Sequence, residues 1–440
     1  MNPPFPLDPM NERSIGIVFV LLLVTSRLAI AQLPGDGFVN GDLLPNAPEL
    51  ANRGSYGVGV RTMTLIHRDQ VDVLHGKDGK YPRYDRSLPV EIWYPARLQP
   101  NQPSTVTYAS TLGRSNDPKR PLIPFTFSGR AARDAEPNRG EGPYPLVIVS
   151  HGYPGSRLLM TYLTENLASK GYVVVAIDHA ESTYGDLAGF PSTLLNRPLD
   201  DLFVLNEMAR LSEKSSSGFL AGLLNADNTA LVGYSMGGYG VLNVAGAGYS
   251  PQALNLFGQM TRGSTALEIR TQTSPAYKAS LDSRIKAVVA FAPWGMERGV
   301  WDATGLAGLT LPTLFIAGSK DDVSGYEKGI KAIYEGAVNA DRYMLTYVNA
   351  RHNVAPNPPP SASMRPGVSA DDYMHYAELA WNEHRINNIN QHFVTAFLGI
   401  HLKKLAYERY LKGPETDPAG AWPGFNARMA VGLEMRHAHP

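Results

Sequence analysis

The serine at position 235 lies in a sequence context that would make it a nucleophile. Residues 233–237 read Gly-Tyr-Ser-Met-Gly, directly after an apolar run and directly before a helical pattern. A sharp turn from strand to helix leaves no room for bulky residues two positions before and after the serine, and glycine satisfies that limit. The pattern predicts that Ser235 projects from a strand end. A second serine, Ser250, lacks the glycine two positions after it that this pattern requires, so it is rejected as a candidate nucleophile.

A serine hydroxyl needs a general base, and that base needs a third group to orient it. On a strand-turn-helix site, the acid and the histidine follow the serine along the chain, just beyond the ends of later strands. Of the eleven histidines, His352 is the one that follows an expected strand after Ser235. His151 also ends an expected strand, but it precedes the serine, and a structural role is expected for it.

The acid is expected at the end of the strand before His352. Residues 314–322 read Leu-Phe-Ile-Ala-Gly-Ser-Lys-Asp-Asp, so two carboxylates compete. The spacing of three residues after Gly318 favours Asp321 over Asp322, which stays open as the alternative. The acid would hold the imidazole in the required tautomer and stabilise the imidazolium that forms.

Acyl transfer also needs two backbone N–H groups that face the developing oxyanion. The segment Ser150-His151-Gly152-Tyr153-Pro154-Gly155 lies where another expected strand ends. Pro154 has no N–H to donate. We therefore expect the oxyanion hole to consist of the amides of Tyr153 and Met236.

Short β-branched runs alternate with helical patterns from about residue 55 onward, which is typical of a mostly parallel sheet covered by helices on both faces. The first two strands lie close enough in sequence to pair as an antiparallel hairpin. The eight expected strands are 56–65, 90–94, 146–150, 173–177, 230–233, 287–292, 313–317 and 343–348, and the expected helices are 158–170, 198–213, 237–247, 326–338 and 371–403.

This pattern predicts one α/β catalytic domain over residues 55–412. Two insertions, 107–143 and 251–283, lack enough hydrophobic periodicity for a core of their own and are expected to be loops or a partial lid. A Pro-, Gly- and Asn-rich linker is expected at 32–54, and a poorly ordered tail at 413–440.

The first 31 residues resemble a secretory signal peptide. Arg13 precedes an apolar run over 15–24, and Ala29-Ile30-Ala31 matches a small-x-small cleavage site before Gln32. The run is about half as long as a bilayer span requires, so export is favoured over a stable membrane anchor. We expect a periplasmic or secreted bacterial protein.

Composition excludes several classes of function. Forty basic residues balance forty acidic ones, which gives nucleic acid or an anionic membrane no strong field to bind. The absence of cysteine excludes disulfides, thiolate nucleophiles and cysteine-ligated metals. No Walker loop, dinucleotide fingerprint or H-E-x-x-H motif occurs, so we expect no cofactor and no metal, and the terminal pair His437 and His439 is interpreted as solvated surface. The oligomeric state stays open.

Taken together, Ser150-His151-Gly152-Tyr153, the 233–238 segment, Gly318-Ser319-Lys320-Asp321 and His352 resemble the α/β-hydrolase family over about residues 55–405. The chain looks most like the bacterial group related to platelet-activating-factor acetylhydrolases and often labelled dienelactone-hydrolase-like. True dienelactone hydrolases use a cysteine, so that activity is not implied. Ala292-Pro293-Trp294 and the 352–357 segment are also similar to cutinase-like polyester hydrolases, and this resemblance implies that Tyr153 and Trp294 line the acyl pocket.

The sequence thus predicts a metal-independent serine esterase that acts on small-molecule esters with small or medium acyl groups. Two alternatives stay open. One is an amidase or peptidase with the same three residues, for which the insertions would form a restrictive lid. The other is an exported non-catalytic binding protein that has kept a hydrolase fold.

Overall fold

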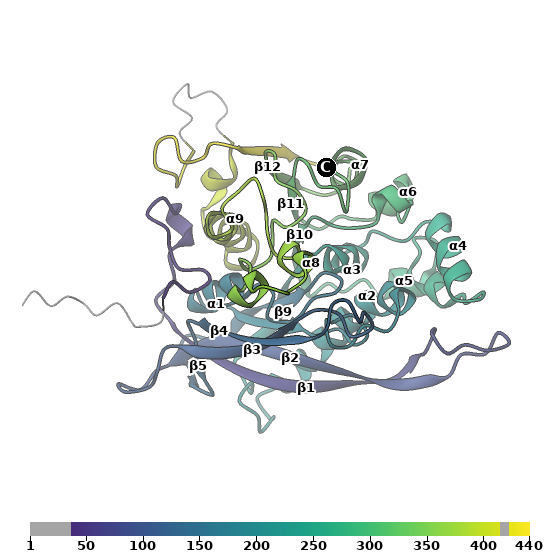
Figure 1. Cartoon of the computed structure of the whole chain (residues 1–440), viewed down its shortest axis with the longest axis horizontal. Coiled ribbons are helices and arrows are strands. Elements are labelled where there is room, and N and C mark those ends of the chain that lie inside the picture. Colours follow the sequence, from purple (N-terminus) through teal and green to yellow (C-terminus); the bar gives the residue numbers. More distant parts are fainter. Residues whose placement is uncertain (1–36, 414–421) are drawn as a thin grey trace, which may run out of the picture. The chain divides into compact units, whose positions relative to one another are not determined.

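A large twisted sheet runs through the described part of this computed structural model, which comprises residues 37–413 and 422–440 (Figure 1). The strands lie side by side in the order β13-β12-β11-β10-β9-β7-β8-β2-β1-β5, and β6 pairs with β2. Their bounds are β1 Gly57–Val71, β2 Arg83–Arg97, β5 Ala132–Arg133, β6 Glu136–Pro137, β7 Tyr144–Ser150, β8 Val173–Ile177, β9 Leu224–Tyr234, β10 Ile285–Phe291, β11 Thr313–Gly318, β12 Arg342–Tyr347 and β13 Leu433–Ala438. The signal peptide predicted at 1–31 and the first residues of the predicted linker lie outside the described residues.

Six neighbouring strands form the middle of the sheet and all run parallel to one another; in their order across the sheet they are β8, β7, β9, β10, β11 and β12. Their side chains are almost entirely buried, as expected for strands covered on both faces. β1 and β2 form a long antiparallel hairpin, and β2 also pairs antiparallel with β8. The predicted fold class is confirmed.

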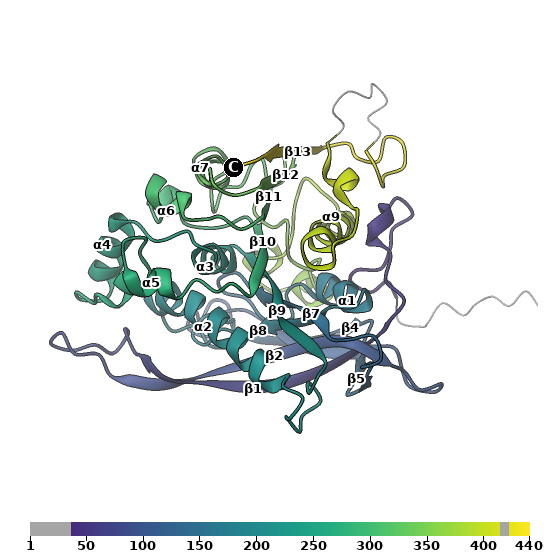
Figure 2. The same cartoon turned by 180° about the vertical axis from the view of Figure 1, so that it is seen from behind.

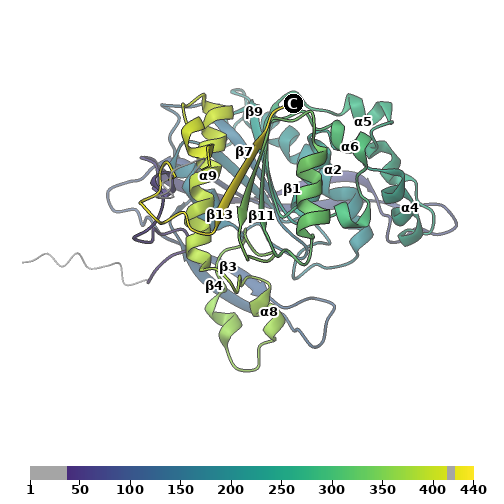
Figure 3. The same ribbon diagram turned by 90° about the horizontal axis from the view of Figure 1, so that it is seen from above.

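Helices cover both faces of this sheet. α1 and α9 pack on one face, whereas α2, α3 and α7 pack on the other. Figure 3 shows α9 and α2 on opposite sides of the sheet. The α-helices are α1 Thr161–Ser169, α2 Phe190–Leu211, α3 Met236–Val244, α4 Pro251–Met260, α5 Pro275–Ala279, α6 Ala303–Ala307, α7 Lys331–Gly336, α8 Ala370–Met374 and α9 Glu383–Lys403. Short 3-10 turns are η1 Glu49–Ala51, η2 Ala266–Arg270, η3 Met296–Arg298, η5 Ser361–Met364 and η6 Glu408–Leu411, and η4 Tyr326–Ile330 is a π turn.

The insertion at 107–143 is not the loop that the sequence predicts. It contributes β5 and β6 to the large sheet, and β3 (Val106–Leu112) and β4 (Ile123–Gly129) form a separate two-stranded sheet. Val106, Tyr108 and Leu112 of β3 are buried, and Tyr108 donates a hydrogen bond to Glu165 of α1 at 2.8 Å. This hairpin buries one face against the main core, so it needs no core of its own.

The insertion at 251–283 is also ordered, as α4, η2 and α5. Ser250 caps α4 and Ser274 caps α5, each by accepting a hydrogen bond from a backbone amide three residues later. Tyr277 of α5 is buried and donates a hydrogen bond to the carbonyl of Asn243 in α3. The segment is therefore attached to the domain body, and the prediction of a loop was wrong.

Two further elements differ from the sequence prediction near the end of the chain. The helix predicted over 371–403 is interrupted: α8 ends at Met374, and α9 begins after Asn382, whose side chain accepts a hydrogen bond from the amide of Arg385 at 2.9 Å. The tail predicted to be poorly ordered instead returns to the sheet, where β13 pairs antiparallel with β12 (Figure 2).

Residues 38–54 pack on the domain and do not behave as a linker. The amide of Leu44 donates to the Asn388 side chain at 2.9 Å, and that of Leu50 donates to Nδ1 of His392 at 3.1 Å. Both acceptors lie on α9, and Ala51 is fully buried. Backbone hydrogen bonds to side chains of α9 hold this segment, so it needs no hydrophobic periodicity, the pattern that would have indicated structure in the sequence.

Candidate active site

Ser235 occupies a strained turn between β9 and α3. Its φ of 53° and ψ of −111° lie outside the regions that ordinary residues favour. Flanking glycines make the turn feasible: a Cβ on Gly233 would lie 2.3 Å from the Gly237 carbonyl oxygen, and one on Gly237 would lie 1.9 Å from that of Ser150. This is the physical reason for glycine at both positions of the G-x-S-x-G pattern.

His352 lies in hydrogen-bond contact with Ser235, although 117 positions separate them in the chain. His352 Nε2 is 3.0 Å from Ser235 Oγ, and its Nδ1 is 2.8 Å from Oδ2 of Asp321. The carboxylate fixes the imidazole with the proton on Nδ1, so Nε2 accepts from the serine hydroxyl. The structure thus brings together the three residues that the sequence selected, at the carboxyl ends of β9, β11 and β12.

The Asp321 carboxylate is held by more than the histidine. Its Oδ1 accepts hydrogen bonds from the amides of Val323 at 2.9 Å and Ser324 at 2.8 Å. Burial opposes ionisation, but the charge and hydrogen bond of His352 and these two amides keep the pKa of Asp321 below its ordinary value. The group is therefore an ionised acceptor behind the imidazole at any pH near neutrality.

Asp322, the competing carboxylate, points elsewhere. Its side chain is 47% exposed and forms an ion pair with Arg351 at the rim of the site. The Arg351 Nε donates to Asp322 Oδ2 at 3.1 Å. This geometry favours Asp321 as the partner of His352.

Two backbone amides next to Ser235 are available as oxyanion donors. Gly152 lies close enough that a Cβ built on it would be 3.5 Å from Ser235 Cβ, which places the following amide of Tyr153 beside the serine. Met236 begins α3 directly after Ser235. Within residues 37–413 and 422–440, neither amide donates a hydrogen bond to another protein group. Both are therefore free to bind a developing negative charge.

Arg197 of α2 anchors the turn that carries the Tyr153 amide. Its buried guanidinium donates to the carbonyl of His151 and, at 3.2 Å, to that of Gly152. The Gly152 carbonyl and the Tyr153 N–H belong to one planar peptide unit, so a donor on one side fixes the direction of the other. No pattern in the sequence singled out Arg197, because its partners at this turn are backbone carbonyls.

The other histidines near the site have structural surroundings. Burial, together with the charge of Arg197, holds the pKa of His151 well below its ordinary value, and its Nδ1 donates to the Gly152 carbonyl at 2.7 Å. His179 lies between Ser150 Oγ at 2.8 Å and Asp200 at 3.1 Å, and burial lowers its pKa to about 3. Both rings are uncharged, and their hydrogen bonds help to hold the segment from Ser150 to Gly152 in place.

A cavity of about 250 Å³ opens directly onto Ser235 and His352. Its other lining residues come from the end of β9 and from four further segments, and they combine aromatic, apolar and charged side chains, which are Tyr153, Pro154, Tyr234, Asp322, Val323, Arg351, Asn353, Asp371, Met374, His375 and Ala377. Within the described part of the chain, no residue of the 251–283 insertion lines it. That insertion is not the lid of this cavity.

The wall formed by residues 371–377 was missed in the sequence because a continuous helix was predicted there. His375 Nε2 donates to the carbonyl of Pro154 at 3.0 Å, and burial lowers the pKa of His375 to about 4. The Asn353 side chain donates to the carbonyls of Met374 and Ala377 and accepts from the Tyr234 hydroxyl. Asn353, directly after His352, thus ties this wall to the serine turn.

Of the two aromatic residues predicted to line the acyl pocket, the structure places one at the cavity and the other behind the serine turn. Tyr153 lines the cavity, whereas Trp294 is not among its lining residues. Trp294 stacks edge-on against Phe190 at 5.2 Å, and Phe190 contacts Tyr153 at 5.3 Å. The amide of Trp294 donates to the Ser235 carbonyl at 3.1 Å, so this residue lies behind the serine turn.

Comparison with known proteins finds a family model, cutinase sequences and an esterase structure that are similar to this chain. A family model described as platelet-activating factor acetylhydrolase, isoform II, matches residues 126–185. Cutinase est1 of Thermobifida alba is 26% identical over 220 residues, or 50% of this chain and 56% of that protein. Cutinase 1 of Thermobifida cellulosilytica is 22% identical over 221 residues, or 50% of this chain and 64% of that protein. The matched region thus spans little more than half the length of these curated relatives.

A solved structure of a ferulic acid esterase from Streptomyces cinnamoneus has the same fold, with a TM-score of 0.54 at 19% identity. The superposition covers 87% of this chain and 99% of that one. The fold is therefore that of the α/β-hydrolases. The similar proteins are named as cutinases and a ferulic acid esterase, and the matching family model is that of an acetylhydrolase, which confirms the resemblance found in the sequence.

Proposed function

We propose that this chain is a carboxylic ester hydrolase in which Ser235, His352 and Asp321 form the catalytic triad. The observation that carries the proposal is the continuous hydrogen-bonded path from Ser235 Oγ through His352 to Asp321, 3.0 Å and 2.8 Å long, beside an open cavity. The relatives named as cutinases and as a ferulic acid esterase support ester rather than amide substrates.

The chemistry follows from this geometry. Ser235 Oγ attacks the ester carbonyl carbon while its proton passes to His352 Nε2, and the carbonyl oxygen becomes an oxyanion bound by the amides of Tyr153 and Met236. The imidazolium then gives its proton to the departing alcohol, which leaves an acyl-serine. Water, activated by the same imidazole, releases the acid and restores the serine hydroxyl. No metal or cofactor takes part in this sequence.

The cavity supports small or medium acyl groups. Its volume of about 250 Å³ lies below the usual range for pockets that enclose drug-sized ligands, roughly 300–1,000 Å³. The Arg351–Asp322 ion pair and Asp371 give part of its wall a polar character. We therefore propose short-chain esters of small molecules as substrates, with the ester carbonyl placed between Ser235 and Tyr153.

Matched p-nitrophenyl esters and anilides of the same acyl groups test this function. We expect ester hydrolysis with kcat/KM falling as the acyl chain grows beyond the cavity. A preference for the anilides would assign the triad to an amidase. The lack of both activities, together with failure of a fluorophosphonate probe to label Ser235, would instead indicate a non-catalytic binding protein.

We also propose that the protein is exported. The apolar run at 15–24 and the Ala29-Ile30-Ala31 site support this, and they lie outside the described residues. In the described part of the chain, no helix is both long and apolar enough to span a bilayer. We expect the exported form to begin at Gln32, which mass spectrometry of the N-terminal peptide measures, and retention of Met1 in that form would contradict the proposal.

A further inference from the structure

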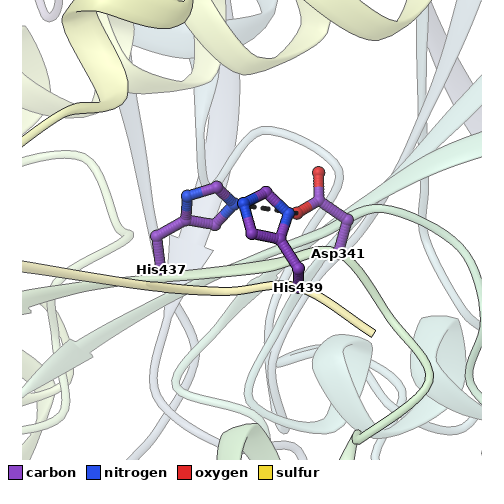
Figure 4. Close-up of side chains that lie close together, drawn as sticks. All are labelled: Asp341, His437 and His439. Carbon is purple, nitrogen blue, oxygen red and sulfur yellow. Dashed lines mark hydrogen bonds and ion pairs between the residues drawn. The ribbon is translucent and has the colours of Figure 1, made fainter.

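Three metal-ligating side chains converge at the last strand of the chain, far from the serine site. Asp341 Oδ1 is 2.8 Å from His437 Nε2 and 3.2 Å from His439 Nδ1, and one ligand atom from each residue lies within 4.8 Å of the others (Figure 4). The two imidazole rings are 4.2 Å apart at their centres. Both histidines thus contact the same carboxylate oxygen, Oδ1 of Asp341.

The strand register explains this convergence. β13 pairs antiparallel with β12 so that Arg342 faces Ala438 and Tyr343 faces His437. Side chains two positions apart on a strand point to the same face, so His437 and His439 share a face with Tyr343 and Asp341 of the neighbouring strand. A His-x-His pair on one strand and an Asp opposite it therefore form a group of three ligands.

The three ligands are held in place before any ion binds. The His437 ring stacks on Tyr343 with centres 3.8 Å apart and planes 9° from parallel. The Asp341 carbonyl accepts a hydrogen bond from the amide of Thr313 on β11, and the His439 carbonyl accepts one from Arg342. Such anchoring lowers the conformational cost of closing a metal site.

We propose that Asp341, His437 and His439 bind a zinc ion. Two neutral imidazoles and a carboxylate form a ligand set that suits zinc, with a water molecule completing the tetrahedron. Neighbouring ligand atoms of tetrahedral zinc lie about 3.3 Å apart, given bonds of roughly 2.0–2.1 Å. The two contacts to Asp341 are already near that separation, so the ion can bind with small side-chain movements, each neutral imidazole ligating through the nitrogen that faces Asp341 and keeping its proton on the other ring nitrogen.

The role of this ion is structural. Asp341 precedes the amino end of β12, whereas Ser235, Asp321 and His352 follow the carboxyl ends of the parallel strands. The zinc site therefore lies near the amino ends of the parallel strands, whereas the cavity lies near their carboxyl ends. It links β13, which among the described strands pairs with β12 alone, to the body of the sheet. This inference is independent of the proposed esterase activity.

Titration of the full-length, untagged protein with ZnCl₂ after removal of metals with EDTA tests the site. An affinity tag with histidines must be absent because it would bind the same ion. We expect one zinc per chain by calorimetry, and a rise in melting temperature of about 3–5 °C at a hundredfold excess over Kd, reversed by EDTA. Ester hydrolysis should be unchanged by either treatment.

Variants distinguish this site from general surface binding. His439→Gln, at a side chain that is 75% exposed, and Asp341→Asn should each weaken zinc binding by at least about tenfold without a change in melting temperature in EDTA. His75→Gln is the matched control, since His75 also pairs with an aspartate, Asp72, but within the described part of the chain this pair belongs to no group of three possible metal ligands. Absence of saturable binding, or equal binding by His439→Gln and the unmodified protein, would overturn the proposal.

Discussion

Replacement of Ser235 by alanine is expected to lower the turnover of p-nitrophenyl acetate by a factor of at least about 10⁴. The substitution removes the hydroxyl that bonds to His352 Nε2, and it leaves the oxyanion amides and the cavity in place. Alanine accepts the backbone turn no worse than serine does, so the melting temperature should change little. Steady-state kinetics and a thermal melt measure the two effects separately.

An exposed serine supplies the control for this experiment. Ser361 begins the η5 turn and does not line the cavity, so Ser361→Ala should keep full activity. A fluorophosphonate probe should label the unmodified protein and Ser361→Ala but not Ser235→Ala. Wild-type turnover by Ser235→Ala would refute the proposed mechanism outright.

Replacement of Asp321 by asparagine is expected to lower kcat by about 10⁴ as well. An asparagine Oδ1 would still accept from the amides of Val323 and Ser324, so the loop should keep its shape. Its NH₂ group, however, would face His352 Nδ1 and donate to it. That contact selects the tautomer with the proton on Nε2, which cannot accept the proton of Ser235.

Asp322→Asn is the matched control for Asp321→Asn. It has the same change in chemistry one residue along the chain, but it removes an ion pair with Arg351 at the exposed rim. Asp322 does not contact His352, so we expect a change in kcat of less than about tenfold, and an effect of the altered cavity wall should appear in KM. If Asp322→Asn had the larger effect, the acid of the triad would have to be reassigned.

The fold class could be predicted from the sequence because parallel buried strands give continuous apolar runs separated by helical patterns. The sharp turn at Ser235 was also visible, since the steric limit at Gly233 is set by Gly237, four residues further along the chain. Signals of this kind are local. They do not depend on knowing which distant segment packs on which.

The elements that the sequence did not reveal depend on distant partners. The β3–β4 hairpin buries one narrow face against α1, and β13 needs β12 to complete its hydrogen bonds. Arg197 bonds to backbone carbonyls that leave no trace in side-chain identity. The interruption before α9 depends on Asn382, a helix N-cap inside a pattern that otherwise reads as one long helix.

The docking of residues 44–50 on α9 ties the beginning of the described chain to its end. The hydrogen bonds from Leu44 to Asn388 and from Leu50 to His392 each bridge more than 340 positions, and the backbone amide of Glu49 donates to the carbonyl of Gly424. Contacts of such high sequence separation form late and slow the folding of a nascent polypeptide. During synthesis residues 44–50 therefore cannot reach their final position until α9 has been made, and deletion of this segment would uncover the part of α9 on which it docks.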